Sequence, residues 1–464
     1  MRQIGLTNNK NSAHHRDDTM PADTIPAPAT KVGNFRWGII VLLFTALAIN
    51  YTHRQMVGLF KPTLESELHW NEEGYALVVT WFQAAYAIGQ LSFGRFLDVA
   101  GVRIGYAIAY TIWVAAHMAT GMVASPLEFT AARFVLGLGE SGSFPSSLKA
   151  IAEWFPQKER ALAAGIFNAG TSVGVMVAAA GIPFIALASF HIGGIPGELH
   201  GLGWGWRGSF VLTGGLSLLW LVAWLLIYRN PRQAPKLRPA ELAWIESDQP
   251  KGEAEKIGWL RLILAKDTWT YAIAKFMIDP IWWLYLFWLP DFLHKTYGLD
   301  LGSFGPPLIV IYLMSDLGSV AGGWMSSFLI KNSVSVNLAR KSTFLLFALC
   351  AVPMFFIHNV HELWPAVLMI GLATAGHQAF SCNVYTLPSD LFPRAAVGSV
   401  LGIGGAAGGI GGMLMSLAVG WILQTTHSYT LIFAIAAFTY LAAFAVIHLM
   451  SPRLKRNETI GLQA

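Results

Sequence analysis

An arginine and a glutamate stand in a stretch of small and apolar residues, RFVLGLGESGSFPSSLKAIAEWFP, at residues 133–156. Arg133 and Glu140 are seven residues apart, so in a helix they lie within about 20° of one face and roughly 10 Å apart along the axis. This separation is too long for the ion pair that residues four apart can form. If the stretch spans a membrane, each charge costs about 2.5–3.5 kcal/mol and is expected to face a water-filled cavity or a charged partner. In a cavity, Glu140 can load and release a proton and Arg133 can stabilise the ionised carboxylate; the alternative is a static pairing with charges on other helices.

A second candidate cation lies in NYTHRQ, residues 50–55. Arg54 is always protonated, and its planar guanidinium suits a carboxylate bound through two hydrogen bonds. The alternative is an arginine that extends to lipid headgroups at the membrane edge. His53 points about 100° away from Arg54 on a helix, and it is either a titrating group or a hydrogen-bonded packing residue.

Two further segments place polar residues in apolar surroundings. In AKFMIDPIWWLYLFWLPDF, residues 274–292, Lys275 and Asp279 are four apart, so they either act at a site or neutralise one another. In AGHQAFSCNVYTLPSD, residues 375–390, the polar side chains include His377, Gln378, Ser381 and Asn383. Such groups suit the recognition of sugar hydroxyls, but they also hold neighbouring helices together.

The amino-acid composition indicates whether these residues lie in a soluble or a membrane protein. Hydrophobic residues make up 54% of the 464 residues and charged residues only 12%, whereas a soluble protein is about a quarter charged. The net charge of +5 is spread over short loops and gives no nucleic-acid signal. The chain is therefore predicted to be an integral membrane protein. It shows no metal cluster and no nucleophile with a base, so no enzyme activity, metal or cofactor is expected.

Apolar segments long enough to span a bilayer recur twelve times. The predicted spans are 36–60, 74–97, 103–123, 127–150, 160–185, 207–228, 266–292, 304–329, 341–358, 363–388, 397–424 and 428–450.

Basic residues gather in alternate loops, as around Arg95 and Arg103, whereas the loop at 59–73 is mainly acidic. The positive-inside rule then places both termini in the cytoplasm of a multi-pass inner-membrane protein. A charged, proline-rich stretch after the sixth span predicts a cytoplasmic linker with one short surface helix near Pro239–Ser247. The expected parts are a disordered tail (1–33), a six-helix bundle (34–228), the linker (229–263), a second six-helix bundle (264–452) and a tail (453–464).

The two halves share sequence features at matching places. AEWFPQKERA at 152–161 follows the fourth span, and SDLFPRAAVG at 389–398 follows the tenth. GRFLDVAGVR at 94–103 and GWMSSFLIKN at 323–332 likewise occupy corresponding loops. A repeat of nearly half the chain is typical of transporters built from two related helix bundles.

These motifs resemble a known family. GRFLDVAGVR resembles the loop between the second and third helices of the major facilitator superfamily, with Asp98 and Arg103 at its charged positions. NYTHR, ARFVLGLGESGSFPSSLKAIAEWFP and GHQAFSCNVYTLPSDLFP resemble the anion:cation symporter family, and within it hexuronate transporters. The resemblance covers about residues 35–452. It implies an all-α membrane protein of twelve helices in two pseudo-symmetric six-helix bundles.

The resemblance also implies roles for single residues. Arg54 would bind a substrate carboxylate, Tyr86 would contact the substrate, and Arg133 and Glu140 would handle protons. His53 stands where the family has an acidic proton carrier, so either His53 titrates or Glu140 couples alone. The other implied residues are Asp98 and Arg103 as gates, and Asn168, His377, Gln378 and Asn383 as contacts of the substrate or walls of its pocket.

The sequence therefore predicts a monomeric, proton-coupled symporter that imports a sugar acid, such as glucuronate or galacturonate, by alternating access in the lipid bilayer. Alternatives within the same fold are transport of an aldonate, a glucarate-type diacid or an aromatic acid, and uniport or export without proton coupling. A membrane sensor or enzyme is a distant alternative, because the linker is too short for an output domain.

Overall fold

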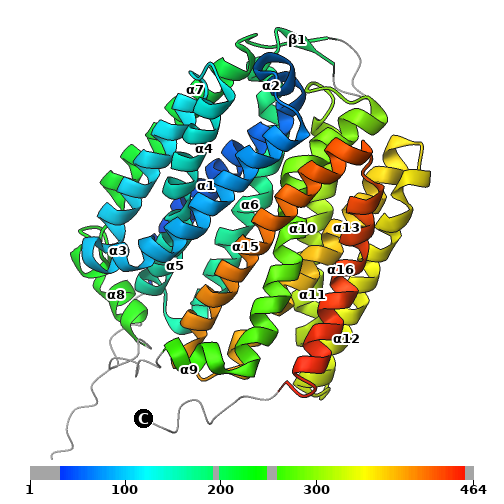
Figure 1. Cartoon of the computed structure of the whole chain (residues 1–464). Coiled ribbons are helices and arrows are strands. Elements are labelled where there is room, and N and C mark those ends of the chain that lie inside the picture. Colours follow the sequence, from blue (N-terminus) through cyan, green and yellow to red (C-terminus); the bar gives the residue numbers. More distant parts are fainter. Residues whose placement is uncertain (1–31, 192–197, 248–258, 455–464) are drawn as a thin grey trace, which may run out of the picture.

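A computed structural model describes residues 32–191, 198–247 and 259–454, and almost all of them are helical (Figure 1). The predicted tails at 1–33 and 453–464 lie mostly outside the described residues, as does part of the predicted linker. The first half contains α1 (Phe35–Leu59), α2 (Lys61–Leu68), α3 (Glu72–Thr120), α4 (Pro126–Ser141), α5 (Ser143–Trp154), α6 (Gln157–Ala186) and α7 (Gly205–Ile227). The second half contains α10 (Lys266–Tyr297), α11 (Gly305–Lys331), α12 (Val336–Ala351), η2 (Val352–Asn359), α13 (Leu363–Val384), α14 (Leu387–Leu391), α15 (Arg394–Thr426) and α16 (Thr430–Met450).

Helices occupy all twelve predicted spans, and among the described residues nine helices are long and apolar enough to cross a membrane. The other three spans coincide with the first part of α3, with α4 and α5, and with α13. Some boundaries differ from the prediction. The span predicted at 127–150 is interrupted at Gly142 between α4 and α5, and the helix predicted at 363–388 ends at Val384. The short helix α2 was not predicted.

The predicted loop between the second and third spans is a kink within α3. Gly101 has a φ of 71° and a ψ of 161°, whereas its neighbours are helical. Side chains with a Cβ rarely adopt this φ, so glycine is the residue that lets the chain reverse there without a longer loop.

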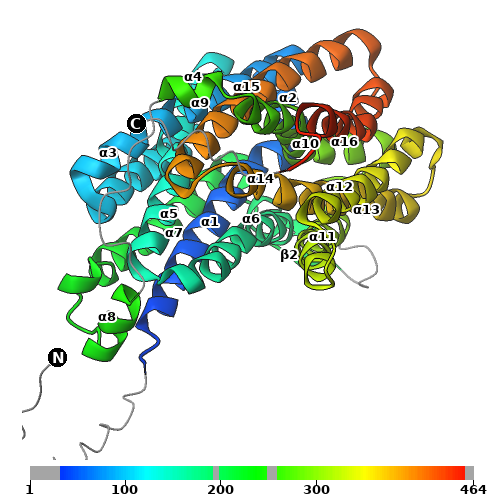
Figure 2. The same cartoon turned by 90° about the horizontal axis from the view of Figure 1, so that it is seen from below.

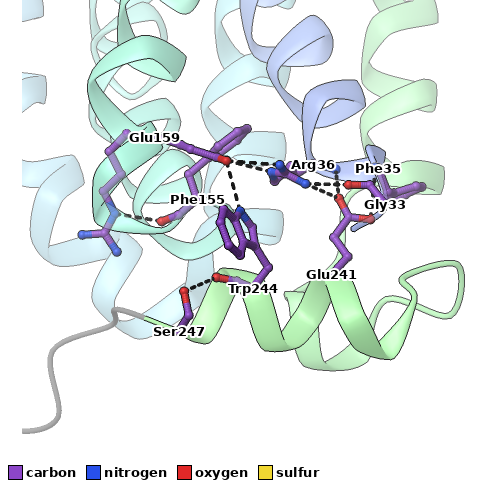
Figure 3. A network of polar contacts seen from close by, with 9 residues as sticks. Gly33, Phe35, Arg36, Phe155, Glu159, Glu241, Trp244 and Ser247 are labelled. Atoms are coloured by element: carbon purple, nitrogen blue, oxygen red, sulfur yellow. Dashed lines mark hydrogen bonds and ion pairs between the residues drawn. The ribbon is translucent and has the colours of Figure 1, made fainter. Parts of the chain in front are cut away.

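The segment between the halves carries η1 (Pro231–Gln233), α8 (Pro239–Glu246) and α9 (Trp259–Leu264). The predicted surface helix is present as α8, but it is anchored to the first half (Figure 3). Glu241 accepts hydrogen bonds from the backbone of Phe35 and Arg36 and from the Arg36 guanidinium. Arg36 also donates to Glu159 at 2.9 Å, and Trp244 Nε1 donates to the other oxygen of Glu159. A carboxylate at the first residues of α1 satisfies amides that have no helical partner.

The two halves lie side by side, with α2 and β1 at one end of the molecule and α8 and α9 at the other (Figure 1). We call these the α2 end and the α8 end. Seen from the α8 end, α1 and α6 lie toward α10 and α11 (Figure 2). Strands β1 (Ser189–Phe190) and β2 (Leu199–His200) form a small antiparallel pair, with Ser189 opposite His200. Buried apolar residues of both halves form one continuous core.

The halves approach closely at the α2 end and diverge toward the α8 end, as the glycines of α15 show. A Cβ added at Gly420 would lie 2.3 Å from Ala76 of α3, which means that the two backbones are in contact. At Gly405 the nearest atom outside the local helix is 3.8 Å away, on Gln90 of α3. At Gly402, nearer the α8 end, no described atom lies within 4 Å. The space between α3 and α15 therefore widens toward the α8 end.

Candidate functional site

Arg54 of α1 and Glu140 of α4 form a buried ion pair. Arg54 Nε donates to Glu140 Oε2 at 2.5 Å, and the two side chains are 3% and 0% exposed. The other oxygen of the carboxylate, Oε1, has no hydrogen-bond partner among the described residues. The pair thus joins two residues that the sequence singled out separately, and it leaves one carboxylate oxygen available.

Aromatic rings surround the Arg54 guanidinium. Its central carbon lies 4.6 Å from the ring centre of Tyr86, 5.0 Å from that of Tyr51 and 5.3 Å from that of Trp283. Ring faces attract a cation, most strongly where water is excluded. Trp283 belongs to α10, so the guanidinium lies where the two halves meet.

Arg133 and Arg54 both lie near Phe82, whose ring centre is 4.9 Å from the Arg133 guanidinium and 5.4 Å from that of Arg54. Arg133 is only 1% exposed. Its Nη1 atom has no hydrogen-bond partner among the described residues, and none of the ion pairs found there includes it. Two buried guanidinium groups therefore lie near one carboxylate, and the cluster of Arg54, Arg133 and Glu140 carries a formal charge of +1.

His53 belongs to a different cluster, which faces α3 and α7. Trp113 Nε1 donates to His53 Nδ1 at 3.1 Å, so Nδ1 acts as an acceptor and the ring is neutral. His53 Nε2 lies 3.1 Å from Ser217 Oγ, which itself donates to the Thr213 carbonyl. The ring also stacks on His117, with the centroids 3.5 Å apart. Of the two alternatives for His53, this geometry matches the packing residue.

The predicted residues of the second half lie in two places. His377 of α13 stacks on Trp282 at 5.3 Å, and its Nδ1 lies 2.8 Å from the Tyr440 hydroxyl. Asn383 accepts from Arg340 at 3.0 Å and donates to the Gly322 carbonyl at 3.1 Å, which ties α13 to α11 and α12. Gln378 is half-buried. The predicted residue Asn168, which belongs to α6 of the first half, is exposed. None of these four contacts the Arg54 and Glu140 pair through a described hydrogen bond.

The predicted gate residues lie on either side of the kink at Gly101. The Arg103 guanidinium donates to the Leu225 carbonyl at 2.6 Å, near the last turn of α7, and Trp224 Nε1 donates to the Arg103 carbonyl. Cations near a helix C-terminus satisfy carbonyls that lack a helical donor. The side chain of Asp98 falls outside those that the structure describes.

Some residues of the site were not predicted from the sequence. Tyr51 precedes Arg54 by three residues, and Phe82 precedes Tyr86 by four, so helical spacing was a usable signal for both. The approach of Trp283 depends on how two distant helices pack, for which the sequence carried no direct signal.

Comparisons with known proteins agree with this architecture. The sequence pattern described as Major Facilitator Superfamily matches residues 43–405. The "Hexuronate transporter" of Escherichia coli (strain K12) is 30% identical over 422 residues, which are 90% of this chain and 94% of that protein. The "Galacturonate transporter" of Dickeya chrysanthemi is 30% identical over 312 residues, 66% of this chain and 86% of that protein. A crystal structure of a bacterial homologue of the human lysosomal transporter Spinster, inward-facing and occupied, matches with a TM-score of 0.65 at 17% identity and covers 91% of this chain and 98% of that chain. This structural match shows the fold alone, and it confirms the predicted fold class.

Proposed function

The chain belongs to the Major Facilitator Superfamily and is a multi-pass membrane transporter, and we propose that it is a proton-coupled symporter that imports a hexuronate such as glucuronate or galacturonate. The names of the matched relatives support a sugar acid as the substrate. The family and these names agree in indicating transport and not catalysis.

The observation that carries the proposal is the net positive charge of the buried cluster. Arg54 and Arg133 bring two guanidinium groups, and Glu140 supplies a single carboxylate. A buried charge that lacks a partner is costly, so the guanidinium group that Glu140 does not neutralise attracts a monoanion to this place. A hexuronate carries one carboxylate and several hydroxyls, and it therefore fits the charge of the site.

Proton coupling follows if the ionised carboxylate of Glu140 and the carboxylate of the substrate compete for the same guanidinium, that of Arg54. While Glu140 is ionised, Arg54 is held by it at 2.5 Å. A proton on Glu140 removes that charge and releases Arg54, whose planar fork can then bind the substrate carboxylate through two hydrogen bonds. Arg133 stabilises the ionised form of Glu140 after the proton leaves. Proton binding and anion binding are thereby linked, because each favours the other.

The remaining predicted residues have supporting roles in this proposal. Tyr86 borders the substrate beside Arg54, and Asn168, His377, Gln378 and Asn383 shape the pocket or contact hydroxyls. Asp98 and Arg103 act as gates at the α8 end. His53 orients α1 against α3 and α7, so that Glu140 is the proton carrier.

We further propose a monomer in the inner membrane, with both termini and α8 on the cytoplasmic side. The widening between α3 and α15 at the α8 end then corresponds to an inward-open state. Rocking of the two halves would open the α2 end and present the same site to the outside.

The direct test is uptake of labelled glucuronate and galacturonate into proteoliposomes, with and without an inwardly directed proton gradient. We expect accumulation above the external concentration only with the gradient, and its loss on addition of a protonophore. Equal uptake in both conditions would show transport without proton coupling. No uptake of either sugar acid would reject hexuronates as substrates.

A further inference from the structure

An ion pair between a buried lysine and a partly exposed aspartate lies on α10, in the other half of the molecule. Lys275 Nζ lies 2.7 Å from Asp279 Oδ1, and the lysine side chain is 2% exposed. Lys275 also donates to the hydroxyl of Tyr385 at 2.8 Å, with its ammonium 4.0 Å from the centre of the Tyr385 ring. An ammonium buried among transmembrane helices is costly to keep and usually marks a working site.

Two tyrosine hydroxyls beside this pair can still form hydrogen bonds to a ligand, which a purely structural ion pair does not require. Because Tyr385 accepts the hydrogen bond from Lys275, its own hydroxyl proton is free to donate elsewhere. Tyr385 is 49% exposed, whereas the hydroxyl of Tyr271, one turn before Lys275, is buried and has no partner among the described residues. A free donor and an unsatisfied hydroxyl beside a neutralised cation form a polar surface without a net charge.

The position of the pair relates it to the Arg54 site. Lys275 precedes Trp283 by eight residues, or about 12 Å along α10, and Trp283 borders the Arg54 guanidinium. The Tyr51 ring, whose centre is 5.0 Å from the Arg54 guanidinium, has Tyr385 among its electrostatic neighbours. The Lys275 group thus lies on the opposite half of the molecule, on the same helix as Trp283 of the Arg54 site.

We propose that Lys275, Asp279 and Tyr385 form a second subsite that takes the uncharged, hydroxyl-bearing end of the sugar acid and excludes substrates with a second carboxylate. The proposal rests on the transport function proposed above. Tyr385 donates to a substrate hydroxyl, and Asp279 cancels the charge of Lys275. A dianion would bring its second carboxylate toward Asp279, and like charges at short range repel each other.

Helix α15 lies against Asp279 at Gly408. A Cβ added at Gly408 would lie 2.1 Å from Asp279 Oδ2, so a glycine at this position leaves the space that the carboxylate occupies. Asp279 thus cancels the charge of Lys275 where α10 and α15 are in contact. Removing it by substitution should convert the subsite from a neutral surface to a cationic one.

The test compares purified wild-type protein with Asp279→Asn by isothermal titration against a monoanion, glucuronate, and a dianion, galactarate. The affinity ratio of galactarate to glucuronate should rise about tenfold in Asp279→Asn, because Lys275 then offers an uncompensated charge. It should stay near the wild-type value in Asp279→Glu, which keeps the charge. It should fall back in the double variant Lys275→Met with Asp279→Asn. An unchanged ratio in Asp279→Asn would overturn the proposal.

Two further measurements keep the test independent of folding and of the proposed function. Tyr385→Phe removes only a hydroxyl from a half-exposed ring, so the protein should fold, and the glucuronate affinity should fall several-fold. An unchanged affinity in that variant would contradict contact with the substrate. If the wild-type protein binds no hexuronate, the proposed function fails. The affinity ratio of galactarate to gluconate, measured in the wild type and in Asp279→Asn, then still shows whether Asp279 selects substrates by charge.

Discussion

Lys61 of α2 and Asp291 of α10 join the two halves of the transporter at the α2 end, with Nζ 2.8 Å from Oδ1 and the two side chains 0% and 1% exposed. Glu65 and Glu72 also contact the ammonium, at 2.7 and 3.0 Å. The oxygens of Glu65, Glu72 and Asp291 lie close enough together to hold a metal ion, but Lys61 already supplies a cation among them. Lys295 and the Tyr429 hydroxyl add further contacts to Glu72 and Asp291. This network must break if the α2 end is to open.

Lys61→Met should therefore shift the transporter toward opening at the α2 end. Removing one partner of a buried pair costs about 3–5 kcal/mol, and here that loss falls on the state in which the α2 end is closed. Spin labels at exposed Met122 and Thr425, one on each half at this end, should show longer separations by pulsed electron paramagnetic resonance. As a control, Lys331→Met removes an exposed lysine from the α8 end and should leave the distances unchanged. Unaltered distances in Lys61→Met would mean that apolar packing holds this end shut.

Glu140→Gln should abolish accumulation driven by a proton gradient. Glutamine keeps the size of the side chain and an acceptor for Arg54, but it cannot take up and release a proton. Counterflow exchange of labelled against unlabelled substrate needs no net proton movement, so it should remain measurable. The comparison of gradient-driven uptake with exchange in the same proteoliposomes checks this. Concentrative uptake by Glu140→Gln would assign coupling to another group.

Arg54→Lys should weaken binding of the sugar acid by about tenfold or more, although the charge is conserved. A guanidinium presents a planar fork for a carboxylate, whereas an ammonium is a point charge. Tyr51, Tyr86 and Trp283 surround a flat cation, which also favours arginine. Isothermal titration measures the change. An affinity equal to wild type would place the carboxylate elsewhere, with Arg133 as the next candidate.

His53→Gln should leave the pH dependence of uptake as in the wild type. In the structure His53 is neutral, because Trp113 donates to Nδ1, and its ring packs between α1, α3 and α7. Glutamine can accept from Trp113 and donate to Ser217, so the packing should largely survive. The check is the initial rate of uptake over a series of external pH values. If the rise or fall of the uptake rate at acidic pH were shifted or lost in His53→Gln, His53 would be assigned as a proton carrier.

The sequence was sufficient to predict the twelve spans and to identify the central charged residues, but it did not predict the short helix α2 or how the charges pair. Apolar length predicts a span directly, and a charge in a span is conspicuous because it is costly. Which charge of another helix pairs with Glu140 depends on how the helices pack, and in the fold Arg54 of α1 takes that place. The Lys61 network was missed for a related reason. Its members are polar residues near helix ends, which look like ordinary surface charges until α2 folds onto α10.

A last prediction concerns Arg36 and Glu241, which fasten α8 to the start of α1 (Figure 3). Glu241 is 1% exposed and accepts from two backbone amides and the guanidinium, so Glu241→Ala leaves Arg36 paired with Glu159 alone and leaves the amides at the start of α1 without their acceptor. A buried donor without an acceptor costs about 1–3 kcal/mol. The matched control is Glu246→Ala on the same helix, whose ion pair with Arg232 is exposed and is worth about 0–1 kcal/mol. Melting temperatures of the purified variants in one detergent should fall clearly for Glu241→Ala and stay near wild type for Glu246→Ala. Equal melting temperatures for the two variants would contradict this prediction. They would mean that the contacts between Glu241 and Arg36 contribute little to the stability of the protein.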